Sequence, residues 1–322
     1  MVSCNEDPSS ISVQSSLPTT QLPLTIQPSE TKLLKSTKIS SPGIIETGTP
    51  IFEKTINSSE IPATTESSDL SVNPDLWKEL PVIPPINQRV IDIYKNGLLQ
   101  GNDPHRFSKI GDCGSTPTWF LGDFDRGERY YTLGEYSYLK EIIQYYAGSF
   151  DRTSLAAQSG FNASSVLTPL WADHSQCRSN ETPLACEYRV HKPILAFITL
   201  GTNDVYHQES FEPQMRKIIE FSIENGIIPV LSTKADNIEK THYINKTLSK
   251  LAQEYQIPLW NYWRAVQPLP DQGLQEDGAH ITWGSNHFDD PLTMQKGWPV
   301  RNLTALQMLE AIYQATYAIT KP

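Results

Sequence analysis

The chain has 322 residues, with 26 Lys and Arg against 36 Asp and Glu, so its formal net charge is −10. A net acidic chain without a long run of basic residues is not typical of a nucleic-acid binder or of a protein that binds an anionic membrane surface. No stretch reaches the roughly 18 consecutive apolar residues that suggest a spanning helix. We therefore expect neither a nucleic-acid partner nor a membrane-spanning segment.

Residues 1–75 differ in composition from the rest of the chain. Of these 75 positions, 33 are Ser, Thr or Pro, and Phe52 is the only one of the chain's 31 aromatic residues in this part. Such a segment buries too little apolar surface to offset its ordering entropy. The composition predicts a disordered tether over residues 1–75, followed by one folded domain over residues 76–322. The alternative is a cloning or gene-model artefact in the first segment.

The first four residues contain a candidate lipidation site. Met1 to Cys4 resemble the last positions of a bacterial lipoprotein signal, in which a small residue, here Ser3, precedes the lipidated cysteine. If the signal is real, Cys4 carries the lipid and the tether holds the domain away from the membrane. The alternative is a chance cysteine near the start of the sequence.

Cys177 and Cys186 lie nine positions apart in a polar segment that contains Pro183. Pro183 and the polar residues favour a turn that would bring the two sulfurs together. No further Cys or His pair completes a four-ligand metal site, so a disulfide fits better than a metal. A disulfide requires an oxidising compartment, and we therefore expect an extracytoplasmic protein, secreted or lipid-anchored. Two reduced loop thiols are the alternative.

From residue 76 onward, short apolar strands alternate with amphipathic helices. This alternation predicts a three-layer α/β/α domain with a central parallel sheet. Ligands gather at the carboxyl ends of the strands in such a sheet. The expected strands are residues 107–111, 193–200, 227–232 and 257–260, and the expected helices are residues 87–94, 138–146, 212–224, 243–255 and 303–319.

Three motifs follow expected strands or precede the last helix: Gly111-Asp112-Cys113, Gly201-Thr202-Asn203-Asp204 and Asp277-Gly278-Ala279-His280. Each alone could be an ordinary turn. Their order, together with Gly160 and the strand ending in Pro229–Thr233, resembles the SGNH (GDSL-type) hydrolase family over roughly residues 105–320. The resemblance implies an esterase-like fold of the flavodoxin-like kind and an active site at the strand ends.

The resemblance assigns a role to each motif residue. It implies that His280 is the general base and that Asp277 fixes its tautomer, which is the logic of acyl-transfer sites. It also implies an oxyanion hole made of the Asn203 side-chain amide and the backbone N–H groups of Gly160 and Cys113, with a helix beginning near Phe161. We expect neither a cofactor nor a metal.

The sequence departs from the family at the nucleophile, where Cys113 stands in place of serine. Cys113 is either a thiol nucleophile, a remnant in a noncatalytic protein that binds a carbohydrate or acyl ligand, or a buried inert thiol. Ser115 as a replacement would lie too far from the base. The presence of Asp277, His280 and Asn203 together favours the first alternative. We therefore expect a hydrolase or acyltransferase acting on a small-molecule ester or on an acyl or acetyl ester of a cell-surface polysaccharide.

Several further residues have weaker claims to the site. His287 is second choice as the base because it lacks the Asp277-x-x-His280 spacing. Trp119, Phe120, Trp283 and Trp298 are candidates for a pocket wall, with a core or lid role as the alternative for the first two.

Overall fold

The computed structural model describes residues 75–320, so the predicted tether up to residue 74 and the candidate lipidation site Cys4 lie outside the described residues. The central sheet has four strands in the order β1-β3-β4-β5, and every neighbouring pair is parallel. These strands are β1 (Asp103–Ile110), β3 (Pro193–Ile198), β4 (Ile228–Ser232) and β5 (Leu259–Trp260). Strand β3 is buried along its whole length, as its continuous apolar run predicts for a strand covered on both faces.

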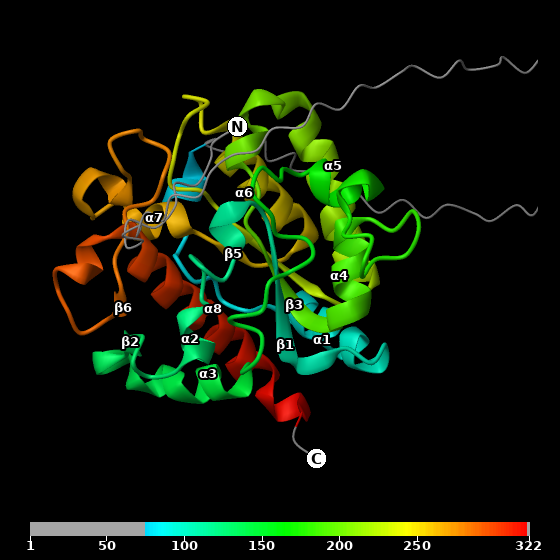
Figure 1. Cartoon of the computed structure of the whole chain (residues 1–322), viewed down its shortest axis with the longest axis horizontal. Coiled ribbons are helices and arrows are strands. Elements are labelled where there is room, and N and C mark those ends of the chain that lie inside the picture. Colours follow the sequence, from blue (N-terminus) through cyan, green and yellow to red (C-terminus); the bar gives the residue numbers. More distant parts are fainter. Residues whose placement is uncertain (1–74, 321–322) are drawn as a thin grey trace, which may run out of the picture. The chain divides into compact units, whose positions relative to one another are not determined.

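Helices cover the two faces of this sheet (Figure 1). Successive side chains of β1 point to opposite faces of the sheet. Phe107 packs on Tyr146, just beyond the end of α3, whereas Ser108 donates a hydrogen bond to Glu187 of α4. Helices α1 (Gln88–Leu99), α3 (Lys140–Tyr145) and α8 (Gly297–Thr320) pack together on the first side, and α4 (Pro183–His191), α5 (Gln208–Glu224) and α6 (Tyr243–Tyr255) lie on the second. The predicted three-layer α/β/α architecture is confirmed.

Shorter elements complete the domain. A two-stranded parallel sheet lies outside the main one. It consists of β2 (Tyr131–Thr132) and β6 (Asn286–His287), and the remaining short helices are α2 (Asp123–Arg126) and α7 (Tyr262–Val266). Within residues 75–320, no helix combines the length and apolarity needed to cross a membrane.

The segment around Pro183 is a helix and not the turn that we expected. Pro183 is the first residue of α4, and the Thr182 side chain caps the helix by accepting from the backbone N–H of Ala185 at 3.1 Å. Proline suits this position because its missing N–H would be unsatisfied there anyway. The predicted disulfide is nevertheless confirmed: it joins Cys177 to Cys186, a residue of α4, with a Cα–Cα distance of 5.3 Å.

Two further expectations were wrong, one about where a helix begins and one about whether a helix forms. The last helix begins at Gly297, six residues before the expected start. No α-helix begins near Phe161, where the chain makes turns and then a short 3-10 helix over Ser165–Leu167. Thr168 precedes Pro169, and the residue before a proline avoids the α-helical region. The helix dipole expected beside Gly160 is therefore absent.

Two buried ionisable side chains, Glu187 and Lys109, make hydrogen bonds at β1. The carboxylate of Glu187 is fully buried and accepts hydrogen bonds from the hydroxyl of Ser108, from the backbone of Leu155 at 2.9 Å and from both terminal nitrogens of Arg152 at 2.6 and 2.8 Å. Lys109 is 1% exposed and donates from Nζ to the carbonyl oxygen of Phe150 at 2.6 Å. Burial, and then the nearby Arg152, lowers the pKa of Lys109 to about 7.

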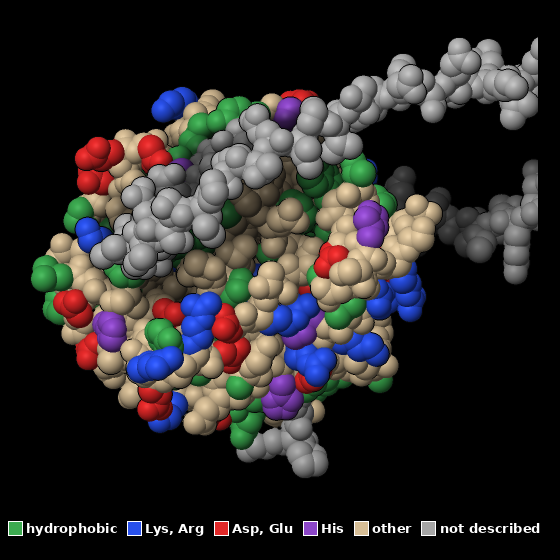
Figure 2. All heavy atoms as spheres, viewed as in Figure 1, with side chains coloured by type: hydrophobic (Ala, Val, Ile, Leu, Met, Phe, Trp, Pro, Cys, Tyr) green, Lys and Arg blue, Asp and Glu red, His purple; other side chains and the backbone are tan. Residues whose placement is uncertain are grey.

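On the outer surface in Figure 2, basic and acidic side chains are interspersed.

Candidate active site

A cavity lies at the carboxyl ends of the central strands, where this fold class binds ligands. Its walls come from the loops after β1, β3 and β4, from the Asp277–His280 loop and from the start of α8. Cys113 and His280, which are far apart in the sequence, both line it. The sheet therefore brings two of the predicted catalytic residues to one cavity.

The turn after β1 positions Cys113. Asp112 caps this turn by accepting from the backbone N–H of Gly114 at 2.9 Å. A Cβ atom at Gly111 would collide with the Ser115 hydroxyl and with Thr199, so the turn requires glycine there. The Ser115 hydroxyl is buried against Thr199, and Ser115 is not among the residues that line the cavity.

Cys113 is disulfide-bonded in this structure, which differs from the free thiol that a nucleophile needs. A thiolate is the reactive form of cysteine, and a disulfide releases it only on reduction or exchange. Cys113 can therefore attack a substrate only after its disulfide is opened. Its position in the cavity wall gives a released thiolate access to a ligand.

His280 and Asp277 are paired within one short loop. The Nδ1 atom of His280 hydrogen bonds to Oδ2 of Asp277, while Oδ1 of Asp277 accepts from the backbone N–H groups of Ala279 and His280 at 3.0 Å each. Burial opposes ionisation of Asp277, but these hydrogen bonds outweigh it and lower its pKa to about 2. An ionised Asp277 that accepts from Nδ1 leaves Nε2 of His280 as the proton acceptor, which is the tautomer a general base needs.

A hydrogen bond joins the two loops that carry Asn203 and Gly160, two of the residues expected in the oxyanion hole. Asn203 lies in the 3-10 helix after β3, and its Nδ2 donates to the carbonyl oxygen of Phe161 at 3.0 Å, beside Gly160. Asp204 ties the same two loops by accepting from the backbone N–H of Ala163 at 2.9 Å. Gly160 has φ of +82°, a conformation that favours glycine. Neither Gly160 nor Asn203 is among the residues that line the cavity.

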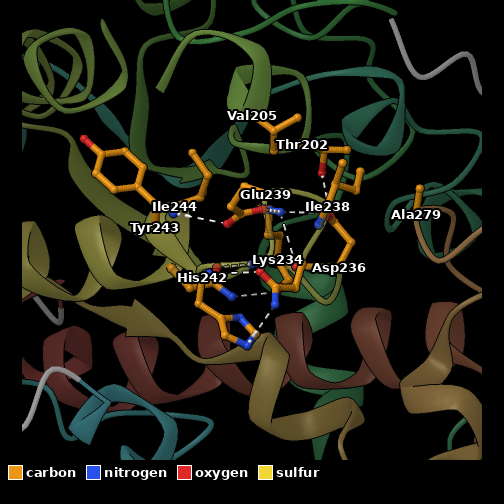
Figure 3. A network of polar contacts seen from close by, with 12 residues as sticks. Thr202, Val205, Lys234, Asp236, Ile238, Glu239, His242, Tyr243, Ile244 and Ala279 are labelled. Carbon is orange, nitrogen blue, oxygen red and sulfur yellow. Dashed lines mark hydrogen bonds and ion pairs between the residues drawn. The ribbon is translucent and has the colours of Figure 1, made fainter. Parts of the chain in front are cut away.

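A buried charge network after β4 was not anticipated from the sequence (Figure 3). Lys234 Nζ contacts the carboxylates of Asp236 and Glu239, the latter at 2.7 Å, and Thr202 donates to Asp236 Oδ2 at 3.1 Å. The network thus joins the loop after β4 to the loop that carries Asn203. A polar run directly after an apolar strand is the sequence signal that could have indicated it.

The residues with weaker claims to the site differ in whether they line the cavity. His287 lies in β6, where its Nδ1 is 3.2 Å from the Thr132 hydroxyl, and it does not line the cavity. Phe120 is fully buried in the core, whereas Trp298 lines the cavity and stacks on Trp119 with ring centroids 5.7 Å apart. Trp283 is 66% exposed and outside the cavity lining.

Within residues 75–320, one cluster has the proximity needed for a metal ion, and it consists of Glu181 with the two cysteines of the Cys177–Cys186 disulfide. Disulfide sulfurs are not thiolate ligands, so this cluster does not fit a metal. The carboxylate of Glu181 is instead engaged by Arg189, which donates to its two oxygens at 2.7 Å each.

No family model matches the sequence, and no curated protein matches it. Several solved structures have a similar fold. One is a lipolytic protein of the G-D-S-L family from Desulfitobacterium hafniense, which has 14% identity and a TM-score of 0.39, with coverage of 63% of this chain and 99% of that chain. A GDSL-like lipase from Bacteroides thetaiotaomicron has 17% identity, coverage of 70% and 99%, and a TM-score of 0.40. A variant of an acetyl xylan esterase from Geobacillus stearothermophilus has 14% identity, coverage of 63% and 94%, and a TM-score of 0.38. At these values, none of the three identifies a substrate for this chain.

Proposed function

We propose that the domain cleaves an ester by acyl transfer, with the reduced thiol of Cys113 as nucleophile, His280 as general base and Asp277 as the residue that orients His280. The observation that carries the proposal is that Cys113 and His280 line one cavity while Asp277 holds Nδ1 of His280. The resemblance of the motifs to SGNH hydrolases supports the same roles.

The chemistry proceeds in two balanced steps. His280 Nε2 takes the Cys113 proton, and the thiolate attacks the ester carbonyl carbon. The C–S bond forms, the C–O bond to the alcohol breaks, and His280 returns the proton to the departing alkoxide. Water, or another acceptor hydroxyl, then gives a proton to His280 and attacks the thioester. This releases the acid or a new ester and restores the thiol.

The tetrahedral intermediate of each step carries a negative oxygen. We assign its donors to the backbone N–H groups of Cys113 and Gly160 and to the Asn203 amide hydrogen that Phe161 does not take. Donors that are fixed before the reaction stabilise developing charge without reorganising. The substrate we propose is a small-molecule ester or an acyl or acetyl ester of a cell-surface polysaccharide.

The deciding experiment measures hydrolysis of 4-nitrophenyl acetate by the full chain before and after mild reduction. We expect activity after reduction in the wild type, loss of it in Cys113→Ala, and trapping of a hydroxylamine-sensitive thioester adduct by mass spectrometry. The double variant Cys177→Ser/Cys186→Ser is the control, because it shows whether the effect of reductant comes from the other disulfide. Equal hydrolysis by reduced wild type and Cys113→Ala would exclude Cys113 as the nucleophile.

A noncatalytic binding protein is the second candidate, and the disulfide-bonded state of Cys113 favours it. A sulfur held permanently in a disulfide leaves the cavity as a binding site only. Under this alternative, reduction produces no esterase activity, while acylated sugars still bind the cavity in a manner that His280→Ala weakens.

We further propose that the protein works outside the cytoplasm, either secreted or anchored through the residues 1–75 tether by a lipid on Cys4, which would occupy the sulfur of Cys4 and exclude it from any disulfide. The Cys177–Cys186 disulfide supports an oxidising compartment. Expression from the gene's own chromosomal locus, followed by detergent partitioning, tests the anchor. We expect the wild type in the detergent phase and Cys4→Ala in the aqueous phase. Aqueous partitioning of both would exclude the lipid.

A further inference from the structure

Arg301 is a buried cation with unused hydrogen-bond donors in the wall of the cavity. It lies in the second turn of α8, is 7% exposed and lines the cavity beside Cys113. Its NH1 donates to the carbonyl oxygen of Gly114 at 3.0 Å, and its buried Nε has no hydrogen-bond partner among the residues that the structure describes. Within residues 75–320, no carboxylate forms an ion pair with it.

Three aromatic rings fix the guanidinium plane. The guanidinium carbon is 4.8 Å from the ring centroid of Phe120, 5.0 Å from that of Trp298 and 5.7 Å from that of Tyr262. Rings at these distances attract the cation, but they accept few of the five N–H donors that an arginine carries. A buried charge with unmet donors is costly unless a partner compensates it. Within the described part of the chain, these surroundings leave a donor of Arg301 available to a ligand.

The other charged groups of the cavity do not fill this role. Lys234 is already neutralised by Asp236 and Glu239, so it is not the cation left for a ligand. Asp112 accepts from Gly114 and attracts Arg301 electrostatically, but its burial outweighs that attraction and raises its pKa, so Asp112 compensates Arg301 only in part. The start of α8 also contributes positive potential through the helix dipole.

We propose that Arg301 binds a carboxylate of the substrate, so that the ester cleaved in this cavity is an anionic one. This inference rests on the proposed function, because it names the substrate class of the same cavity. A carboxylate matches the planar donor fork of arginine and gives short, charge-assisted hydrogen bonds. The carboxylate has two chemical sources: the acyl half, as in a dicarboxylic half-ester, or the alcohol half, as in an acylated uronic acid.

Binding without turnover is the first test. Tryptophan fluorescence of the reduced full chain reports on the site because Trp298 stands beside the guanidinium. We expect saturable quenching by succinate or glucuronate, little response to succinamide or glucose, and an affinity that is weaker by about tenfold or more in Arg301→Gln. The variant Arg301→Lys should recover part of the affinity, and melting curves confirm that both variants are folded.

Arg264→Gln is the matched control, since Arg264 also donates to a backbone carbonyl, that of Leu80 at 3.2 Å, but lies outside the cavity lining. It should bind the anions as the wild type does. Equal affinity of wild type and folded Arg301→Gln for succinate and glucuronate, or no saturable binding of either anion by the wild type, would overturn the inference.

A kinetic arm separates the inference from the proposed function. The reduced enzyme should cleave mono(4-nitrophenyl) succinate, or an acetylated glucuronate, with kcat/KM about tenfold or more above the neutral 4-nitrophenyl butyrate or acetylated glucose. Arg301→Gln should bring the ratio close to one. Preference for the succinate marks the acyl half as the source, and preference for the glucuronate marks the alcohol half. If the enzyme cleaves anionic and neutral esters equally well, the anionic-substrate inference is wrong but the proposed catalysis stands. If the protein binds anions through Arg301 but cleaves no ester, the proposed catalysis is wrong but the anion site stands.

Discussion

The side-chain amide of Asn203 donates to the carbonyl oxygen of Phe161 at 3.0 Å, which fastens the loop after β3 to the loop that contains Gly160. These two loops are 42 residues apart in the chain. An amide carries two N–H groups, so this hydrogen bond fixes the orientation of Asn203 with one of them, and the proposed oxyanion role requires the other.

Replacement of Asn203 by alanine should therefore reduce turnover more than substrate binding. We expect kcat of the reduced enzyme to fall by about 10²–10³-fold, the range measured for loss of one oxyanion donor, with KM nearly unchanged. Asn225→Ala is the matched control, because Asn225 also donates to a phenylalanine carbonyl, that of Phe221 at 2.8 Å, at the end of α5. A kcat that is equal in the two variants would remove Asn203 from the oxyanion hole.

Asp277→Asn should preserve the loop and lose the catalytic tautomer. Asparagine still accepts from the backbone N–H groups of Ala279 and His280, but its amide no longer acts as a charged acceptor for Nδ1. We expect a fall in kcat of up to about 10⁴-fold, as for the equivalent change in serine proteases, with little change in melting temperature. The nearby exposed Asp271→Asn serves as a control. Retained activity in Asp277→Asn would show that His280 needs no carboxylate.

The Arg152–Glu187 ion pair should be a large contributor to stability. Removing the guanidinium in Arg152→Met leaves the fully buried carboxylate of Glu187 without its charge partner. We expect the free energy of unfolding in urea to fall by about 3–5 kcal/mol. Arg216→Met breaks a more exposed pair with Glu212 and Glu254, and should cost about 1 kcal/mol or less. Similar losses in both variants would contradict this.

Lys109 should make stability depend on pH in the alkaline range. Its pKa is about 7 in the folded chain against an ordinary value of 10.5, so between these values the unfolded chain binds a proton that the folded chain does not. The free energy of unfolding therefore rises with pH across this window, by up to about 1.4 kcal/mol per pH unit from this group. Below pH 7 both states carry the proton, and the contribution stays constant.

Lys109→Met isolates the effect. The stability of this variant relative to wild type should be highest at pH 7 and should decline steadily as the pH is raised toward 10, measured by urea unfolding at each pH. Lys250→Met is the control, because Lys250 is an exposed partner of Glu212. A difference between Lys109→Met and wild type that is flat over this range would mean that Lys109 keeps its proton when buried.

The Cys177–Cys186 disulfide should stabilise the domain without affecting the cavity. The bond closes a short loop, for which chain-entropy arguments give about 2–3 kcal/mol. We expect Cys177→Ser/Cys186→Ser to unfold at correspondingly lower urea concentration and to keep the kcat/KM of the reduced wild type. A loss of activity at a temperature where the variant is fully folded would connect this loop to the active site.

Much of the fold could be predicted because its signals are local. The apolar run of β3 and the helical spacing in α5 and α6 are visible in consecutive residues, and they place the loops that follow the strands. The segment around Cys186 was misjudged because its polar residues suggested a loop, while Thr182 and Pro183 are also a helix start. Nothing in the sequence alone decided between these two interpretations.

The parts of the site that were missed depend on contacts between distant residues. Arg301 sits inside a helix and meets Gly114 across 187 positions, so no motif surrounds it. The Lys234 network closes through Thr202 of another loop. The disulfide-bonded state of Cys113 likewise depends on where the folded chain places its sulfur, and a Gly-Asp-Cys motif gives no sign of it.

The pairing of His280 with Asp277 inside a four-residue loop has a consequence for engineering and for evolutionary change. In many triads the base and its orienting acid come from separate segments, so each must be maintained independently. Here a single graft of this loop onto another α/β scaffold would transfer both residues. The scaffold would then only have to place a nucleophile turn within reach of His280. An insertion outside Asp277–His280 would displace the pair as a unit, whereas one inserted residue between them would break it.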